Sequence, residues 1–280
     1  MNKQFLRYAI GCGLVGLLVG GIWLGNFLHH LRYPDTFTLD KIVHDRVERF
    51  SNSNCPADLL QQKFSYLGHG TQMIAFEGED KKTVLKLFLQ KSIKGEKKFR
   101  IKSLKDRVPF WRRKKEKKKQ LHREESLQST FQHYAKAFEA LKEETGLIGI
   151  HLSATRGEYS PCYIRDFHGK EWVCDLDRIS FVLQAKALPV RDVFPGLQTE
   201  EEKRNFFQAM DTLLDQRARK GFKDLGQGRV FDANYGFIGD RAILLDAGRL
   251  GYSEEVRLHP EPEIKKMQGR LRARFKEKKL

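Results

Sequence analysis

Residues 9–28 form an apolar run near the start of a chain that is otherwise polar and basic. At 1.5 Å per residue, a helix of this length spans roughly 30 Å, the hydrocarbon thickness of a bilayer. Lys3 and Arg7 precede the run, and the small-residue pattern that ends a cleaved signal peptide does not follow it. The run predicts an uncleaved single-pass membrane anchor, with a cleaved signal peptide as the alternative.

The charge of the remaining chain is concentrated in one segment. The net charge is +16, and residues 91–119 contain 15 Lys or Arg against three acidic residues. Clustered basic side chains bind anionic lipid headgroups, whereas nucleic acid is the less favoured partner and a solvated insertion the simplest alternative. The 20 Phe, 8 Tyr and 3 Trp indicate a packed core rather than disorder. We therefore expect a folded domain with a basic insertion that contacts lipid.

The four cysteines show no spacing typical of a metal site. Cys162 and Cys174 flank a turn-like segment at residues 167–170, so they are expected to face each other across a hairpin. They are either two small core residues or, in an oxidising compartment, a disulfide.

Hydrophobic periodicity predicts an α+β fold with a mainly β first half and a helical second half. A short helix is expected at residues 40–50, directly after the anchor. The other expected elements are three strands within 63–90, a helix at 121–144, β-structure at 148–184, a helix at 200–220, a hairpin at 235–246 and a helix at 262–279. The glycine turn at residues 68–70 and the polar turn at 77–82 separate the first three strands.

Four short motifs occur in a suggestive order. Gly68 and Gly70 lie in a turn between two strands, and Lys86 lies in the alternating strand Val-Leu-Lys-Leu. Asn234 precedes the predicted hairpin, and Asp246 opens an Asp-Ala-Gly turn after it. In this order the motifs resemble the protein-kinase-like fold, in a compact and divergent bacterial form. The resemblance covers roughly residues 63–250.

The resemblance implies a site for ATP and Mg²⁺. Gly68, Gly70 and Lys86 would bind the cofactor, because glycine admits a phosphate close to the backbone and a lysine offsets its charge. The amide of Asn234 and the carboxylate of Asp246 would hold the metal. Taken singly, each motif has a simpler explanation as a hairpin turn, a solvated strand face or a common Asp-x-Gly turn.

The chain departs from the family pattern at the catalytic loop. The family places its catalytic Asp five residues before the Asn, and position 229 here is Arg. Asp224 is the best match, with Asp232 as the alternative. Glu124, on the helix at 121–144, is the expected partner of Lys86. Only 34 residues follow Asp246, which predicts a truncated helical C-lobe and a substrate other than an ordinary protein.

The predicted domain organisation has four parts. These are an anchor at residues 1–33, a juxtamembrane helix and linker at 34–62, a β-rich N-lobe at 63–188 and a helical C-lobe at 189–280. The predicted function is a single-pass membrane protein whose domain binds ATP and Mg²⁺ and phosphorylates a small or membrane-linked substrate. The alternative is an inactive kinase-like scaffold that binds anionic lipid or a partner. If the domain binds nucleotide, the supply of ATP predicts that it lies in the cytoplasm.

Overall fold

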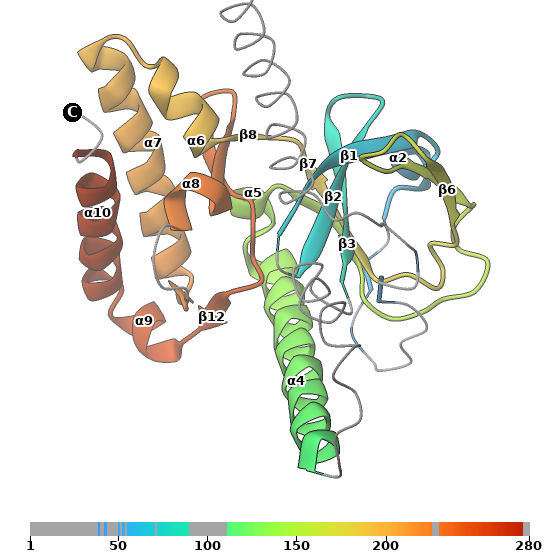
Figure 1. Cartoon of the computed structure of the whole chain (residues 1–280). Coiled ribbons are helices and arrows are strands. Elements are labelled where there is room, and N and C mark those ends of the chain that lie inside the picture. Colours follow the sequence, from blue (N-terminus) through green and yellow to red (C-terminus); the bar gives the residue numbers. More distant parts are fainter. Residues whose placement is uncertain are drawn as a thin grey trace, which may run out of the picture.

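The structure is a computed structural model, and it has an α+β fold built from one large sheet, two small sheets and several helices (Figure 1). The residues that it describes are 39, 42–43, 50, 52–53, 55–70, 72–89, 111–225 and 230–276.

The large sheet has seven strands in the order β4-β7-β3-β2-β1-β5-β6. Its strands are β1 (Lys63–His69), β2 (Met73–Gly78), β3 (Thr83–Phe88), β4 (Leu147–His151), β5 (Cys162–Arg165), β6 (Glu171–Cys174) and β7 (Phe181–Ala185), and helix α2 (Ala57–Leu60) precedes them. Neighbouring strands are antiparallel except β1 and β5, which are parallel. In the β2–β3 turn the Asp80 carboxylate accepts hydrogen bonds from the N–H groups of Lys82 (2.8 Å) and Thr83 (2.9 Å). The predicted polar turn is thus confirmed, and its chemistry is that of an Asp side chain closing a backbone turn.

The helix predicted at residues 40–50 is wrong at its start. Ile42 forms an antiparallel bridge with Leu89, and the N–H of Val43 donates to the carbonyl of Phe88 at 2.9 Å. The carbonyl of Val43 accepts from the N–H of Ser180 at 3.0 Å, so the segment lies between the chains that leave β3 and enter β7. Ile42 and Val43 are both buried. Two adjacent apolar residues are as compatible with an extended segment that is covered on both faces as with a helix, so the pattern did not distinguish the two.

The long helix begins earlier than its pattern predicted. Helix α4 (Trp111–Ala140) starts inside the basic segment, and α5 (Lys142–Thr145) follows it before Gly146 ends the helical stretch with φ +64°. Charged residues favour helix without contributing to an apolar stripe, so periodicity alone does not locate this start. The predicted lipid contact of residues 91–119, and its nucleic-acid alternative, concern side chains outside the described part of the chain.

The second half contains two small sheets and the remaining helices. A three-stranded sheet has the order β11-β10-β8, and β12 pairs with β9. The elements are β8 (Leu188–Pro189), α6 (Val190–Val193), the 3₁₀ helix η4 (Phe194–Gly196), α7 (Glu200–Arg219), β9 (Phe222–Asp224), α8 (Val230–Asn234), β10 (Tyr235–Ile238), β11 (Arg241–Leu244), β12 (Leu250–Tyr252), α9 (Glu254–Leu258) and α10 (Glu261–Lys276). The helix predicted at 200–220 and the hairpin predicted at 235–246 are confirmed. The strands change from one sheet to another between β7 and β8, and the predicted lobe boundary at 188/189 stays a prediction.

Two apolar cores lie on opposite faces of the large sheet. One contains alternate side chains of β1, β2 and β3 together with Cys162 and Cys174. The other contains Phe88 and Val182 from the sheet, the inner face of α4, and most apolar residues of the second half. Phe131 and Tyr134 of α4 contact the ring of Phe88 edge-on, with centroids 4.6 and 5.5 Å away. Helix α4 thus lies between the sheet on one side and β12 and α7 on the other (Figure 1).

Cys162 and Cys174 are register partners across β5 and β6, so the prediction that they face each other is confirmed. Both are buried free thiols, and burial raises the pKa of each to about 12. The structure therefore has two small core residues at this pair of positions.

The membrane part of the predicted fold class is wrong. Among the described residues, no helix is both long enough and apolar enough to span a bilayer. The longest, α4 and α7, contain many charged side chains, which is the physical reason. This finding contradicts the predicted single-pass membrane localisation with its cytoplasmic domain. The apolar run at residues 9–28, and with it the predicted bilayer contact, lies outside the described residues.

A buried ion pair joins α7 to α10. The side chains of Arg217 and Glu263 are 1% and 6% exposed, and the guanidinium donates to Glu263 Oε1 at 3.3 Å. The same guanidinium donates to the Tyr235 hydroxyl at 2.7 Å. Glu263 Oε1 also accepts the backbone N–H of Asp224 at 3.2 Å, so this pair holds the end of β9 in place.

We expect Arg217→Met to lower the free energy of unfolding by about 1–3 kcal/mol, because the buried Glu263 carboxylate and Tyr235 hydroxyl lose a donor while Lys266 still pairs with Glu263. Urea denaturation measures this change. Arg219→Met is the matched control on the same helix: Arg219 pairs with Asp215 and is 57% exposed, so its loss should cost less than about 1 kcal/mol. Equal effects of the two substitutions would contradict a structural role for the buried pair.

Candidate functional site

Lys86 lies on β3 with its side chain on the face toward α4. Its cross-strand neighbours are Ala75 on β2 and Val182 on β7. The ammonium group donates a hydrogen bond to the carbonyl of Leu245 at 2.5 Å, in the segment that follows β11. Burial lowers the pKa of Lys86 to about 8, and the negative charge of Asp246 partly opposes this shift. Lys86 therefore stays protonated at neutral pH in a poorly hydrated position.

Asn234 and Asp246 lie at the open end of the β10–β11 hairpin. The hairpin pairs Tyr235 with Leu244, and the N–H of Leu245 donates to the carbonyl of Asn234 at 2.7 Å. Asp246 follows directly, and its Oδ1 accepts the N–H of Gly248 at 2.9 Å. The Asp246 side chain is exposed. The structure thus brings Lys86 to the segment that carries Asp246, and the backbone of Asn234 is bound to the residue before Asp246.

Helix α4 supplies two further groups that the sequence did not single out. The Tyr134 hydroxyl donates to Asp246 Oδ1 at 3.2 Å, and His133 Nδ1 donates to the carbonyl of Gly248 at 2.9 Å. Burial, followed by the charge of Asp246, raises the pKa of Tyr134 well above its usual value, so the hydroxyl remains a neutral donor. Tyr134 lies within the helix predicted at 121–144, and an aromatic residue there signals core packing rather than a site.

Glu124 does not take the predicted place beside Lys86. It is exposed and lies ten residues before Tyr134, about 15 Å away along the helix axis. Within the described part of the chain, Tyr134 is the α4 side chain that reaches Asp246.

Gly68 and Gly70 lie at the β1–β2 turn, in line with Lys86 across the sheet. Gly68 pairs with Ala75, which in turn pairs with Lys86, so Gly68 is about 10 Å from the Lys86 backbone. The N–H of Gly70 donates to the carbonyl of Met73 at 2.8 Å. Among the atoms of the described residues, a Cβ at Gly68 would meet none within 4 Å, and one at Gly70 would meet only that carbonyl, at 3.8 Å. The fold itself does not require glycine here, which leaves room for a ligand to approach the backbone.

The two candidate catalytic acids have different surroundings. Asp224 ends β9 and is the register partner of Leu250 on β12. Leu250 follows Asp246 by four residues along the chain. Asp232 lies on α8 and forms an ion pair with Arg274 of α10, whose Nε is 3.1 Å from Oδ2. The β9–β12 pairing ties Asp224 to the segment that carries Asp246, whereas the ion pair ties Asp232 to the last helix.

No family model matches the sequence, and no curated protein matches it. The kinase-like fold and the roles of these residues therefore stay predictions that rest on the motifs and on the geometry above.

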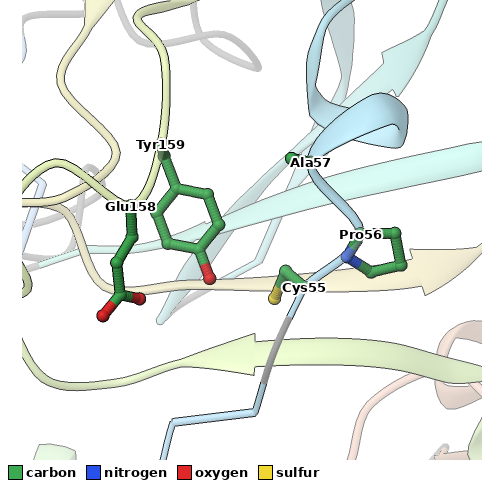
Figure 2. A pocket seen from close by; sticks show the side chains of 5 residues that line it. All are labelled: Cys55, Pro56, Ala57, Glu158 and Tyr159. Carbon is green, nitrogen blue, oxygen red and sulfur yellow. The ribbon is translucent and has the colours of Figure 1, made fainter.

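A second feature is a hollow of about 430 Å³ lined by Cys55, Pro56, Ala57, Glu158 and Tyr159. The Tyr159 hydroxyl points toward the Cys55 thiol (Figure 2). Burial raises the pKa of Cys55 to about 11, although hydrogen bonds with Tyr159 and Ser53 act in the opposite direction. A neutral thiol is a poor nucleophile and a poor metal ligand. No group of three or more His, Cys, Asp or Glu side chains in the described residues is arranged to hold a metal ion.

The loop that carries Tyr159 is held by the carboxylate of Asp177. This carboxylate accepts the Thr155 hydroxyl at 2.6 Å and the N–H groups of Gly157 and Glu158 at 2.8 and 3.1 Å. Burial alone would raise the pKa of Asp177, but these hydrogen bonds bring it below its usual value. The loop therefore closes around an ionised carboxylate.

His151 lies next to this loop and is completely buried. Its Nδ1 donates to the carbonyl of Ile179 at 2.9 Å, and its ring stacks on Phe181 with centroids 5.0 Å apart. Burial lowers the pKa of His151. The hydrogen bond to Ile179 and the negative charges of Glu158 and Asp177 raise this pKa, but they do not fully offset burial. The ring is thus a neutral core residue.

We expect the stability of the protein to fall as the pH drops below about 6.5, because the unfolded chain then binds a proton that the folded His151 does not. The His151→Gln variant keeps a hydrogen-bond donor but has no group that titrates here. Its stability should therefore fall less than that of the wild type between pH 7.5 and pH 5. Urea midpoints across this range measure the difference. His259→Gln, at an exposed position, should retain the wild-type slope, and the same slope in His151→Gln would refute the interpretation.

Proposed function

We propose that the chain binds a magnesium–nucleoside triphosphate complex at Lys86, Asn234 and Asp246, in a kinase-like domain. One observation carries the proposal: a poorly hydrated ammonium on β3 contacts the carbonyl of Leu245 and senses the charge of Asp246, at the open end of a hairpin that begins after Asn234. Burying an ammonium group is costly, and strongly perturbed ionisable groups gather at functional sites. The order of strand lysine, hairpin and Asp-x-Gly turn is the order that the resemblance implies.

The donor set suits Mg²⁺. This ion prefers oxygen ligands and uses one or two protein carboxylates together with substrate phosphates. The exposed Asp246 carboxylate and the Asn234 amide supply such a set, and a bound Mg²⁺ would offset charge on the phosphates. Lys86, protonated at neutral pH, would lie beside those phosphates, and the open space above Gly68 leaves its backbone accessible to them.

Asp224 is the candidate base for phosphate transfer to a small hydroxyl-bearing substrate. Its backbone is fixed twice, by the β9–β12 ladder and by the hydrogen bond from its N–H to Glu263. A carboxylate held in this way would accept the proton of an attacking hydroxyl. The ion pair of Asp232 with Arg274 makes that residue the weaker candidate.

The alternative is a kinase-like domain that binds nucleotide without transferring phosphate. One observation favours it: the side chain by which α4 contacts Asp246 is the neutral hydroxyl of Tyr134 rather than a carboxylate. Binding and turnover therefore need separate measurements.

Mg·ATP at ten times its Kd should stabilise the protein by about 1.4 kcal/mol, which is a rise in Tm of about 3–6 °C. Lys86→Met should abolish this rise, while the Tm without nucleotide stays the same or increases because an ammonium in a poorly hydrated position is lost. Lys82→Met removes the same charge from an exposed position in the preceding turn and should keep the rise. Differential scanning calorimetry measures all three proteins. A wild-type Tm that does not respond to Mg·ATP would end the proposal.

Asp224→Asn should lower the rate of ATP hydrolysis by roughly 10²-fold or more and leave the Mg·ATP-induced Tm rise unchanged, because it removes a base rather than a metal ligand. Single-turnover release of ADP, with water as acceptor, measures the rate. Asp232→Asn is the comparison. Loss of hydrolysis in Asp232→Asn alone would move the base to Asp232, and a wild type that binds Mg·ATP without releasing ADP would establish the non-catalytic alternative.

A further inference from the structure

Tyr134 is a buried aromatic residue with one polar atom, and that atom contacts the proposed metal ligand. The residue is 1% exposed and packs edge-on against Phe88. A tyrosine hydroxyl in such a place needs a partner, since water does not reach it. Its partner is Oδ1 of Asp246, at 3.2 Å.

The same carboxylate oxygen accepts a second donor. The N–H of Gly248 lies 2.9 Å from Asp246 Oδ1, so both hydrogen bonds converge on one oxygen of an exposed side chain. Two donors at one oxygen fix the rotation of the carboxylate and leave Oδ2 as the oxygen with capacity for a cation.

The turn that carries Asp246 rests directly on α4. A Cβ at Gly248 would lie 3.3 Å from Thr130 Cγ2 and 3.5 Å from Tyr134 Cε2. His133, the residue before Tyr134, donates to the carbonyl of Gly248 at 2.9 Å. Three residues within one and a half turns of the helix therefore set the position of both ends of this turn.

We propose that Tyr134 is a positioning residue: it holds the Asp246 carboxylate with Oδ1 bound to the protein and Oδ2 available to a divalent cation. The inference rests on the proposed function, and it gives α4 a role at this site through a neutral hydroxyl that contacts Asp246. Groups that orient a metal-binding carboxylate typically change metal affinity by 10–100-fold when they are removed.

The test separates metal-dependent from metal-independent nucleotide binding in the full chain. Isothermal titration calorimetry gives the Kd of ATP with Mg²⁺ and with EDTA. The Kd in EDTA divided by the Kd with Mg²⁺ reports how much the metal contributes to binding, and this quotient is the ratio used below. Tyr134→Phe removes one oxygen and keeps the ring against Phe88. We expect it to reduce the ratio by 10–100-fold and to leave the Kd in EDTA unchanged.

Tyr252→Phe is the matched control, since it also removes a hydrogen bond from a tyrosine to a carboxylate, here Glu254, and should keep the wild-type ratio. An unchanged ratio in Tyr134→Phe, or an equal weakening of both Kd values, would overturn the inference while the proposed function stands. A wild type that binds no ATP, or binds it equally with Mg²⁺ and EDTA, would instead refute the proposed site. If Tyr134→Phe does not fold, His133→Ala tests the same turn and should also lower the ratio.

Discussion

The contact between Lys86 and the segment after β11 joins the large sheet to the second half of the chain. A lysine in a poorly hydrated position needs both an acceptor and a negative charge, because an unpaired buried ammonium is costly. The carbonyl of Leu245 and the carboxylate of Asp246 meet these two needs, and both come from the second half of the chain, about 160 residues away in sequence. Only an arrangement that brings the hairpin of β10 and β11 against β3 satisfies them together.

Helix α4 is shared by the packing of the sheet and by the candidate site. Its Phe131 and Tyr134 contact Phe88, while its His133 and Tyr134 contact the turn after Asp246. A comparable arrangement holds Asp224, whose backbone is bound by the buried pair of Arg217 and Glu263 from α7 and α10. The Asp246 carboxylate and the Asp224 backbone are thus held by buried polar groups on helices distant in sequence, where low hydration strengthens each hydrogen bond.

Where sequence signals are local, the predictions agree with the structure. The first three strands follow from alternating apolar residues and from a turn that an Asp side chain closes, as Asp80 does. The hairpin of β10 and β11 follows in the same way from its Gly-Asp turn. Ile42 and Val43 were assigned to a helix because two adjacent apolar residues fit either structure, and only the gap between the chain ends of β3 and β7 selects the extended one. The predicted membrane architecture is contradicted by the helices of the described residues.

The sequence by itself determined the α+β class and the residue types of the candidate site, namely a strand lysine, an asparagine before a hairpin and an aspartate after it. These are encoded by neighbours within a few residues, where period and turn chemistry act directly. The tertiary structure decided that Tyr134 of α4 contacts Asp246, and that Asp224, unlike Asp232, lies on a strand paired with β12, shortly after Asp246. Those choices depend on how α4, α7 and α10 pack. Such packing arises from contacts between residues far apart in the chain, and local sequence patterns do not predict these contacts.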